Sequence, residues 1–473
     1  MKRMRGTLKG PGRCATAWLG VVLATVCIAR AAGARDLGDI LVQKGLITPE
    51  ELTQAREEEK QKAAAEESRR DAIAAKLPKW LEKLTPFGDV RVRDDGFYAN
   101  DLNARTRFRV RARLGLNVNV SDEVGATVRL ASGNVDDPIS TNQTFERAFT
   151  RKPVNLDQAY LTLKPGKSLG LEPGWVTLTA GKFGVNAYRV SELVWDDDLS
   201  LEGATETLNL VDQREGLLRL LKVNAFQWVV DEVANAGDPW MGGGQVVADT
   251  VLGDNGPTLT VAFADFHYEG LDQVARKFLN QYNDPPTNSK PNSSYNGQLP
   301  NSNSVVKDAN GKVLGYESGF NVVNGGGELN FADVFGVAAG LFGEVAYNTQ
   351  ADSRNTGFAT GVGIGKAGRD WYHNGLKNPG DWAISYTYER VAKDAVFGAF
   401  SYDDLNYVRA EATQKGSTNL EASILRLDYM LLPNFQLTAK AHFINALDRK
   451  ASNAALDGND TMFRTQLDAM LKF

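Results

Sequence analysis

The sequence predicts an all-β protein, a transmembrane antiparallel β-barrel preceded by a short helical segment. Three observations lead to this fold class. Long segments alternate apolar and polar residues with the period of a β-strand, because successive strand side chains point to opposite faces. Short turns alternate with long polar loops, an asymmetry typical of barrels that span a membrane. The chain also ends on a strand whose apolar face terminates in an aromatic residue, Phe473.

Residues 1–34 are predicted to be a secretory signal peptide. Five basic residues and no acid open the chain, an apolar run follows, and small residues precede a cleavage site after Ala34. A membrane anchor is the weaker interpretation, because the apolar run is short. The only cysteines of the sequence, Cys14 and Cys27, lie in this segment, so residues 35–473 contain no thiol.

The charge balance limits the classes of partner. Without residues 1–34, which hold six of the 53 basic residues, 47 basic residues remain against 58 acidic ones, and the formal net charge changes from −5 to −11. Nucleic-acid binding proteins show a basic excess, so we expect no nucleic-acid partner. No run of eighteen apolar residues follows residue 34, which argues against a membrane-spanning helix.

Residues 35–84 are expected to form a helical periplasmic segment. They are rich in good helix formers, and Thr48-Pro49-Glu50-Glu51 supplies an N-cap, a proline at the first helical position and acids in the first turn. The stretch LGDILVQKGLITPEELTQA resembles the small helical N-terminal motif of type II secretion ATPases, which implies a helix-turn-helix shape only. The following stretch is either a solvated spacer or a coiled stalk that sets the oligomeric state or contacts the cell wall.

Residues 85–473 are predicted to form the barrel. From Phe87 onward, alternating segments have the length of about ten residues that a tilted strand needs to cross a bilayer. They include EVGATVRLASG (123–133), LDQAYLTLKPG (156–166), PTLTVAFADFHYEG (257–270), GDWAISYTYERVA (380–392), NLEASILRLDYMLL (419–432) and FQLTAKAHFINA (435–446). Residues 271–316 are expected to be a polar loop that supplies no core. The pattern fits roughly fourteen to eighteen strands, and single-chain barrels have an even number.

The last strand, TMFRTQLDAMLKF, has two distinct faces. Phe473, Leu471 and Phe463 lie on one face, and the other face holds Lys472, Met470, Asp468, Gln466, Arg464 and Met462. The apolar face resembles the terminal signature that the outer-membrane assembly machinery recognises. This resemblance implies that Phe473, Leu471 and Phe463 form an assembly signal and that the barrel assembly machinery is a partner.

Arginine occupies every second position at the start of RTRFRVRARLGLNVNV (105–120). This arginine ladder consists of Arg105, Arg107, Arg109, Arg111 and Arg113, whereas the intervening residues are largely apolar. An arginine that faces lipid near the midplane costs roughly 2–4 kcal/mol, so an outward ladder would cost on the order of 10 kcal/mol. The ladder is therefore predicted to face a water-filled interior. Arg91 and Arg93 extend it onto the preceding strand.

Two interpretations of these arginines are open. They either pair with acids and stiffen the barrel, or they form one side of a transverse field that sets ion preference. We favour the field, with the opposing acids on loops that fold inward: Asp136, Asp137, Asp196, Asp197 and Asp198. These acids could instead bind Ca²⁺ or be solvated loop residues, and we expect no metal site.

Several stretches resemble the putative porins of Gram-negative outer membranes. They are RLASGNVDDPISTNQTF (129–145), LDQAYLTLKP (156–165), SELVWDDDLSLEGA (191–204) and DWAISYTYERVAKDAVFGAFSYDD (381–404). The resemblance implies a single-chain barrel of about sixteen strands that lies in outer-membrane lipid and passes small solutes or ions. Sixteen-stranded pores often associate as trimers, so a homotrimer is a candidate assembly by analogy.

Motifs of enzymes and cofactor sites are missing. His267, His373 and His442 lie far apart without metal-ligand spacing. GVGIGKAG (361–368) misses the glycine-rich templates and predicts a strand whose small residues face a crowded neighbour. We expect no cofactor and no catalytic residue, and the leading function is passive diffusion of small hydrophilic solutes or ions. The alternatives are a protein that tethers the membrane to the cell wall and a barrel enzyme whose residues meet only in space.

Overall fold

The chain divides into two units, Met1–Leu84 and Thr85–Phe473. The computed structural model describes residues 44, 48–54, 56–58, 60–61, 79–99, 103–135, 137–146, 148–213, 216–233, 237–253, 256–279, 301–366, 370–373, 375–407, 416–447 and 461–473. The predicted signal peptide and Asp136 lie outside these residues.

The first unit contains the predicted helix start. Residues 49–54, 56–58 and 60–61 are helical. The backbone N–H of Glu51 donates to Thr48 Oγ1 at 3.1 Å, and the backbone N–H of Thr48 donates to the Glu51 carboxylate at 2.7 Å. This reciprocal pair is a capping box, and it confirms Thr48 as the N-cap. The choice between spacer and stalk stays a prediction.

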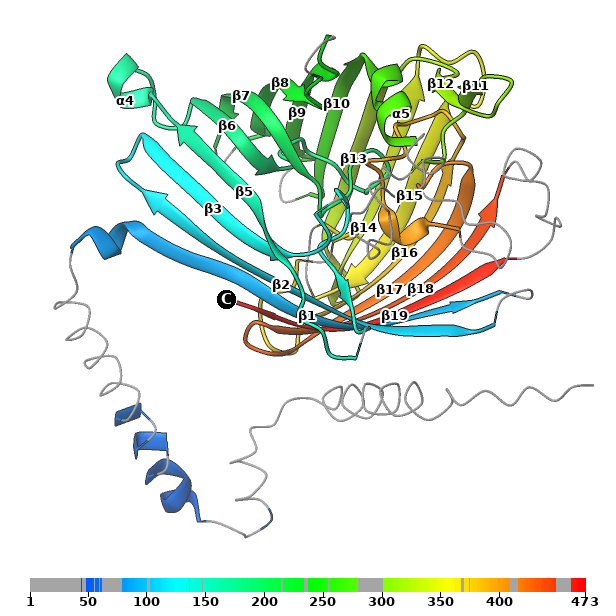
Figure 1. The fold of residues 1–473 in the computed structure, drawn as a ribbon. Coiled ribbons are helices and arrows are strands. Elements are labelled where there is room, and N and C mark those ends of the chain that lie inside the picture. Colours follow the sequence, from blue (N-terminus) through cyan, green and yellow to red (C-terminus); the bar gives the residue numbers. More distant parts are fainter. Residues whose placement is uncertain are drawn as a thin grey trace, which may run out of the picture. The chain divides into compact units, whose positions relative to one another are not determined.

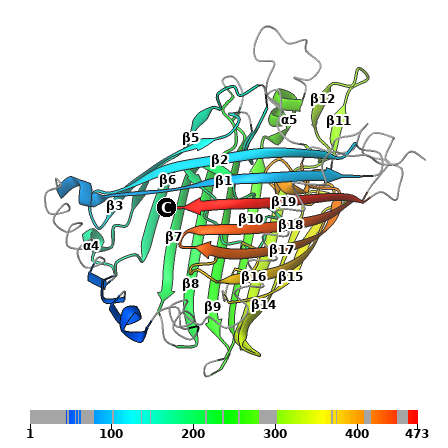
Figure 2. The ribbon, with the colours of Figure 1, turned by 90° about the horizontal axis from the view of Figure 1, so that it is seen from below.

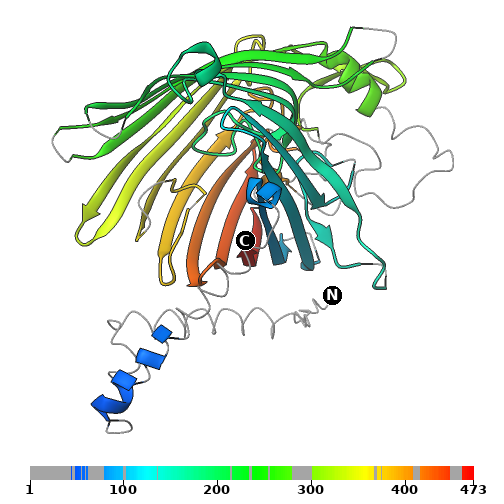
Figure 3. The ribbon, with the colours of Figure 1, turned by 90° about the vertical axis from the view of Figure 1, so that its left-hand side faces the viewer.

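The second unit is a closed antiparallel barrel of sixteen strands, as the sequence predicts (Figures 1 and 2). The barrel strands are β1 (Leu84–Tyr98), β2 (Arg105–Asn119), β3 (Val124–Ser132), β5 (Val154–Leu163), β6 (Val176–Gly184), β7 (Ser200–Asp212), β8 (Leu218–Val229), β9 (Trp240–Val251), β10 (Thr258–Glu269), β13 (Asn321–Val334), β14 (Val337–Asn348), β15 (Thr356–Gly365), β16 (Trp382–Val391), β17 (Leu420–Leu432), β18 (Phe435–Ala446) and β19 (Met462–Lys472). Each pairs with its neighbours in sequence, and β1 pairs with β19 to close the sheet. Figure 3 shows the oblique course of the strands around the barrel.

The other elements from residue 79 onward lie before or between the barrel strands. They are the 3-10 helix η1 (Lys79–Lys83) before β1, β4 (Gln143–Thr144), which pairs with β2, α4 (Gly166–Leu169), α5 (Leu271–Leu279), the β11 (Val305–Lys307)–β12 (Val313–Tyr316) hairpin and the 3-10 helix η2 (Asp403–Leu405).

The expectation that residues 271–316 supply no core is wrong for the parts of this range that the structure describes. Leu271, Val274 and Ala275 of α5 are buried in the same cluster as Val313 and Tyr316 of β12. The reason is the helical spacing of the apolar residues in α5, which gives the helix one apolar side. Figure 1 shows α5 and the β11–β12 hairpin at the same end of the barrel.

The two faces of the barrel wall differ as the alternation predicts. On β2, Phe108 and Leu114 are 46% and 57% exposed, whereas Arg109 and Arg111 are 7% and 6% exposed. The apolar residues therefore form the outer surface, where lipid is the solvent. Placing the guanidinium groups on the other face avoids the cost of charge in lipid.

Loop segments that fold inward occupy part of the barrel interior. Residues 185–199, which connect β6 and β7, place Trp195 against Trp228, with ring centroids 5.2 Å apart. Within the connection between β16 and β17, Phe397 is 2% exposed. These aromatic residues belong to one buried cluster that spans loops and strands.

A third segment enters from the end of the barrel that carries the short turns. It connects β15 and β16, and its Trp371 side chain is fully buried. A Cβ atom on Gly340 or Gly363 would lie 2.0 or 2.4 Å from the indole ring, so both positions require glycine. Gly363 confirms the prediction that small residues of 361–368 face a crowded neighbour.

Phe473 ties the end of the chain to the first strand. The N–H of Gly88 donates to the Phe473 carbonyl at 2.8 Å, and the N–H of Phe473 donates to the Gly88 carbonyl at 3.0 Å. A Cβ atom on Gly88 would lie 2.8 Å from Phe473 Cζ, so the Phe473 ring can pack here only because residue 88 has no side chain. The residue that resembles an assembly signal is thus also part of the closure between β1 and β19.

Deleting Phe473 is expected to impair barrel closure. The variant loses both backbone hydrogen bonds to Gly88, each worth about 1 kcal/mol, together with the ring that covers this glycine. We expect reduced heat-modifiable protein in isolated outer membranes and accumulation in the periplasm. Wild-type amounts of folded barrel would contradict this role. Phe473→Tyr keeps the backbone contacts and the ring and serves as the control.

Candidate functional site

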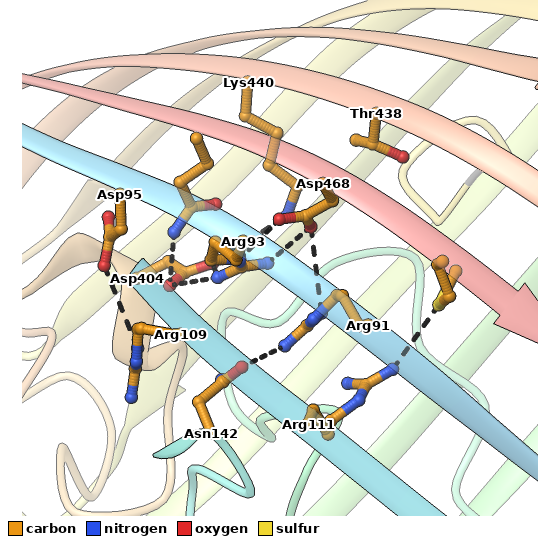
Figure 4. Close-up of polar contacts among 12 residues, drawn as sticks. Arg91, Arg93, Asp95, Arg109, Arg111, Asn142, Asp404, Thr438, Lys440 and Asp468 are labelled. Carbon is orange, nitrogen blue, oxygen red and sulfur yellow. Dashed lines mark hydrogen bonds and ion pairs between the residues drawn. The ribbon is translucent and has the colours of Figure 1, made fainter. Parts of the chain in front are cut away.

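A group of inward-facing arginines lies on three adjacent strands. We call it the basic wall; its members are Arg91 and Arg93 on β1, Arg107, Arg109, Arg111 and Arg113 on β2, and Arg464 on β19. Strand β1 pairs with β19 on one side and with β2 on the other. The basic wall therefore lies where the first and last strands of the barrel meet (Figure 4).

The part of the wall nearest β19 is a closed network of ion pairs. Arg93 binds Asp468 with both Nε and Nη2, at 2.7 and 2.9 Å, and its Nη1 lies 3.2 Å from Asp404. Arg464 binds Asp95 in the same two-pronged way, at 2.8 and 3.1 Å, and its Nη2 donates to Asp404 at 2.8 Å. Paired guanidinium–carboxylate bonds are the strongest of the charge-assisted type. Asp404 thus holds the β16–β17 connection against the wall.

At the C-terminal end of the arginine ladder, Arg111 and Arg113 both bind the same two acids, Asp89 and Asp198. Arg111 Nε and Arg113 Nε donate to the two oxygens of Asp89, at 2.9 and 2.6 Å. Both Nη1 atoms donate to Asp198 Oδ1 at 3.2 Å, and Thr141 donates to the other oxygen of Asp198. Burial raises the pKa of Asp198, but Arg111 and Arg113 outweigh it and hold the pKa below its usual range.

Arg91 and Arg109 have weaker acidic partners than the rest of the wall. Arg91 Nη2 donates to Asn142 Oδ1 at 2.8 Å, and its nearest ion-pair contact, to Asp468, is 3.9 Å. Arg109 Nη2 donates to the Ser140 hydroxyl at 3.2 Å, and its contact to Asp95 is also 3.9 Å. The charges of these two arginines are therefore the least neutralised of the wall.

Two further arginines of the predicted ladder, Arg105 and Arg107, differ from each other in their surroundings. Arg107 binds Asp95 at 2.7 Å, whereas Arg105 is exposed at the start of β2 and lies outside the basic wall. The structure brings the remaining predicted arginines together as described. Whether they set ion preference belongs to the proposal below.

Among the predicted opposing acids that the structure describes, Asp198 alone makes an ion pair with the wall. Asp197 instead pairs with Arg189, and His373 Nε2 lies 3.2 Å from its carboxylate. Asp196 accepts hydrogen bonds from the backbone N–H groups of Asp198 and Asp403 at 2.7 and 2.9 Å. The bond from Asp403 joins the β6–β7 connection to the β16–β17 connection. Asp137 accepts the backbone N–H of Ile139 at 3.3 Å.

The loop acids are held in unusual protonation states. Burial and the charge of Asp403 raise the pKa of Asp137 to about 8, and burial together with Asp404 raises the pKa of Asp403 to about 7. Burial and Asp197 raise the pKa of Glu192 to about 8. For His373, burial lowers the pKa, but the carboxylates of Asp197 and Asp370 outweigh it and raise the pKa to about 10. At neutral pH, His373 is therefore charged, Asp137 and Glu192 are largely protonated, and Asp403 is about half protonated.

Four acids that pair with the wall, Asp89, Asp95, Asp404 and Asp468, were not predicted from the sequence, although three of them carried a signal there. Asp89 and Asp95 have the same parity as Arg91 and Arg93 in DVRVRDD, so all four share one face of β1. Asp468 lies on the polar face of the last strand, and closing a barrel pairs its first and last strands. Asp404 carried no comparable signal, because its strand-spanning contacts depend on how a long loop folds.

Across the described parts of the chain, no group of three or more His, Cys, Asp and Glu residues is arranged to hold a metal ion. None of the helices in the described ranges has the length and apolar character needed to cross a bilayer.

The chain matches one protein family and is similar to solved structures. A model of the family described as putative porin matches residues 97–448, whereas no curated protein matches the chain in sequence. The high-pH structure of Pseudomonas putida OprB superposes with a TM-score of 0.50 at 12% identity and covers 84% of this chain and 96% of that chain. The Salmonella typhi OmpF complex with daunomycin gives a TM-score of 0.42 at 12% identity, with 82% and 97% covered.

Proposed function

Because this chain belongs to the putative porin family and is a β-barrel porin of a Gram-negative outer membrane, we propose that it passes small hydrophilic solutes and ions by passive diffusion, with a preference for anions. The observation that carries the preference is the excess of positive charge in the basic wall. Seven arginines meet five ion-pairing acids, Asp89, Asp95, Asp198, Asp404 and Asp468, which leaves a local excess of two positive charges.

Protonation of the nearby loop acids preserves this excess at neutral pH. The carboxyl groups of Asp137 and Asp403 both interact electrostatically with Arg109. Because their pKa values are raised to about 8 and about 7, both groups are at least partly protonated at neutral pH and carry less than a full negative charge. Charged side chains in a pore select ions by the local potential they create. At physiological salt the potential is screened beyond about 8 Å, so charges near the wall outweigh those at the mouth of the barrel.

Both interpretations of the arginine ladder, stiffening by ion pairs and a transverse field, contribute to this proposal. Ion pairs hold the wall together, which agrees with the stiffening interpretation, and the unneutralised remainder supplies the field. We propose a non-enzymatic channel, since no observation on the described residues favours turnover chemistry or a cell-wall tether. The homotrimer and the assembly-machinery and cell-wall contacts stay predictions.

Conductance of the purified protein in a planar bilayer tests the proposal. The variant Trp371→Ala adds an expected change in the size of that conductance. Removing the indole that fills the space between Gly340 and Gly363 is expected to widen the interior and raise the single-channel conductance in KCl. Phe342→Leu, which shortens a neighbouring buried side chain without removing Trp371, is the control and should change the conductance little. Absence of conductance steps from folded protein would contradict the porin function.

Raising the pH is expected to weaken the anion preference. Above about pH 7–8, Asp403, Asp137 and Glu192 ionise in the folded protein and add negative charge near the wall. Their pKa values are raised, so the folded state holds protons that the unfolded chain has released, and stability also falls as the pH rises towards 8. Reversal potentials in a KCl gradient at about pH 6 and pH 9 measure the selectivity effect. Asp403→Asn should flatten the response, and a wild-type response independent of pH would contradict it.

A further inference from the structure

Arg91 and Arg109 leave hydrogen-bond donors unused in a buried position. Each guanidinium carries five N–H donors. Neither Arg91 Nε nor Arg109 Nε has a hydrogen-bond partner among the residues that the structure describes. Arg109 is 7% exposed, and its bond to Ser140 and the distant contact to Asp95 use only two of its nitrogens. Buried donors without partners are rare in native proteins and call for an explanation.

Arg111 adds a third incomplete guanidinium. Its Nε and Nη1 bind carboxylates, but the acceptor of Nη2 is the thioether of Met470 at 3.6 Å. A thioether is a weak acceptor, so this donor is available to a better one. Arg91 on β1 and Arg111 on the paired strand β2 carry like charges, which repel each other. An anion between the two would relieve this repulsion.

Two loop residues, Asn142 and Ser140, connect Arg91 with Arg109. Asn142 accepts from Arg91 Nη2 and donates to the Ser140 hydroxyl at 3.3 Å, and the same hydroxyl accepts from Arg109 Nη2 at 3.2 Å. In the view of Figure 4, Asn142 is joined to Arg91, with Arg109 on one side of it and Arg111 on the other. Ser140 and Asn142 are 4% and 9% exposed, so the loop covers the arginines and limits competition from water.

We propose that Arg91, Arg109, Arg111 and Asn142 form a binding subsite for a compact oxoanion that enters from the barrel interior. An oxoanion presents several oxygen acceptors, which suit guanidinium donors that converge from three side chains. Chloride would be attracted by the same charge but has no directional acceptors to match the planar groups. The subsite rests on the proposed function for access of the anion to the wall.

Equilibrium dialysis of inorganic phosphate against the full-length folded protein in detergent, at low salt and neutral pH, tests the subsite. Arg91→Lys combined with Arg109→Lys keeps both charges but removes the planar donors. We expect phosphate affinity to fall at least about tenfold in this variant, equivalent to about 1.4 kcal/mol. Arg105→Gln removes a charge from the same face of β2 outside the wall and should change the affinity less than about twofold.

Three results would overturn the subsite: no phosphate binding by wild-type protein, equal binding by the double lysine variant, or an equal loss in Arg105→Gln. Heat modifiability on gels verifies that the double variant is folded. If it is not, Arg91→Lys alone takes its place, because Arg91 is not bound to any carboxylate at hydrogen-bond distance.

A bilayer measurement separates this inference from the proposed function. In wild-type channels phosphate should reduce the chloride current, and the double lysine variant should lose this block while its reversal potential in KCl stays unchanged. Chloride current that phosphate does not affect would overturn the subsite and leave the porin function intact. Arginine-dependent phosphate binding by a protein without conductance would support the subsite and overturn the porin function.

Discussion

Replacing Arg109, Arg111 and Arg113 together with Gln is expected to reverse the ion preference from anions to cations. The change removes three positive charges and deprives Asp89 and Asp198 of their partners on β2. The local excess of two positive charges then becomes a deficit of one. Gln keeps polar side chains on the interior face, so insertion should be preserved. The sign of the reversal potential in a KCl gradient measures the effect.

Two control variants separate selectivity from assembly. Adding Asp198→Asn to the triple Gln variant removes one of the uncompensated acids and should move the reversal potential part of the way back. Val110→Arg puts a charge on the outer face of β2 at a cost of roughly 2–4 kcal/mol near the midplane, and it should impair insertion instead. A triple variant that inserts and keeps the wild-type reversal potential would contradict a selective role for the ladder.

Asp404→Asn is expected to destabilise the folded barrel by about 3 kcal/mol, the lower end of the range for breaking a buried ion pair. Asp404 is 4% exposed and receives bonds from Arg93, Arg464 and the Gln466 amide. The arginines would keep their strand partners Asp468 and Asp95, which limits the loss. The temperature at which the folded band converts to the unfolded band on gels should fall clearly.

The neighbouring acid provides a matched control with the opposite expectation. Burial and Asp404 raise the pKa of Asp403 to about 7, so its carboxyl is already partly neutral at neutral pH. Asp403→Asn should therefore leave stability unchanged or increase it. Equal destabilisation by the two Asn variants would show that Asp404 has no special role in holding the β16–β17 connection.

The sequence predicts what depends on strand period and misses what depends on loop folding. The alternation on β2 assigns Arg109 and Phe108 to opposite faces, because that assignment follows from local geometry alone. The pairing of Arg93 with Asp468 requires the added inference that β1 closes on β19. By contrast, the inward course of residues 185–199 and the burial of Trp371 depend on packing between segments far apart in the chain. No short-range pattern encodes them.

The acid clusters illustrate the same division. Asp196, Asp197 and Asp198 are adjacent in sequence, yet each has a different partner: Asp403, Arg189 and the arginine pair on β2. A tight backbone turn directs three consecutive carboxylates in three directions. The cluster in the sequence therefore places acids in this loop, but it does not indicate that Asp198 is the one that reaches the basic wall.

The central claim is that the arginine face of β2 borders water and the apolar face borders lipid. Single cysteines test it directly, since Cys14 and Cys27 lie before residue 35 and leave the barrel without other thiols. A water-soluble, negatively charged methanethiosulfonate reagent should modify Arg107→Cys and Arg113→Cys and reduce the current. It should leave Phe108→Cys and Leu114→Cys, on the outer face, unmodified and the current unchanged. Modification of the Phe108 and Leu114 variants with protection of the arginine variants would contradict the account.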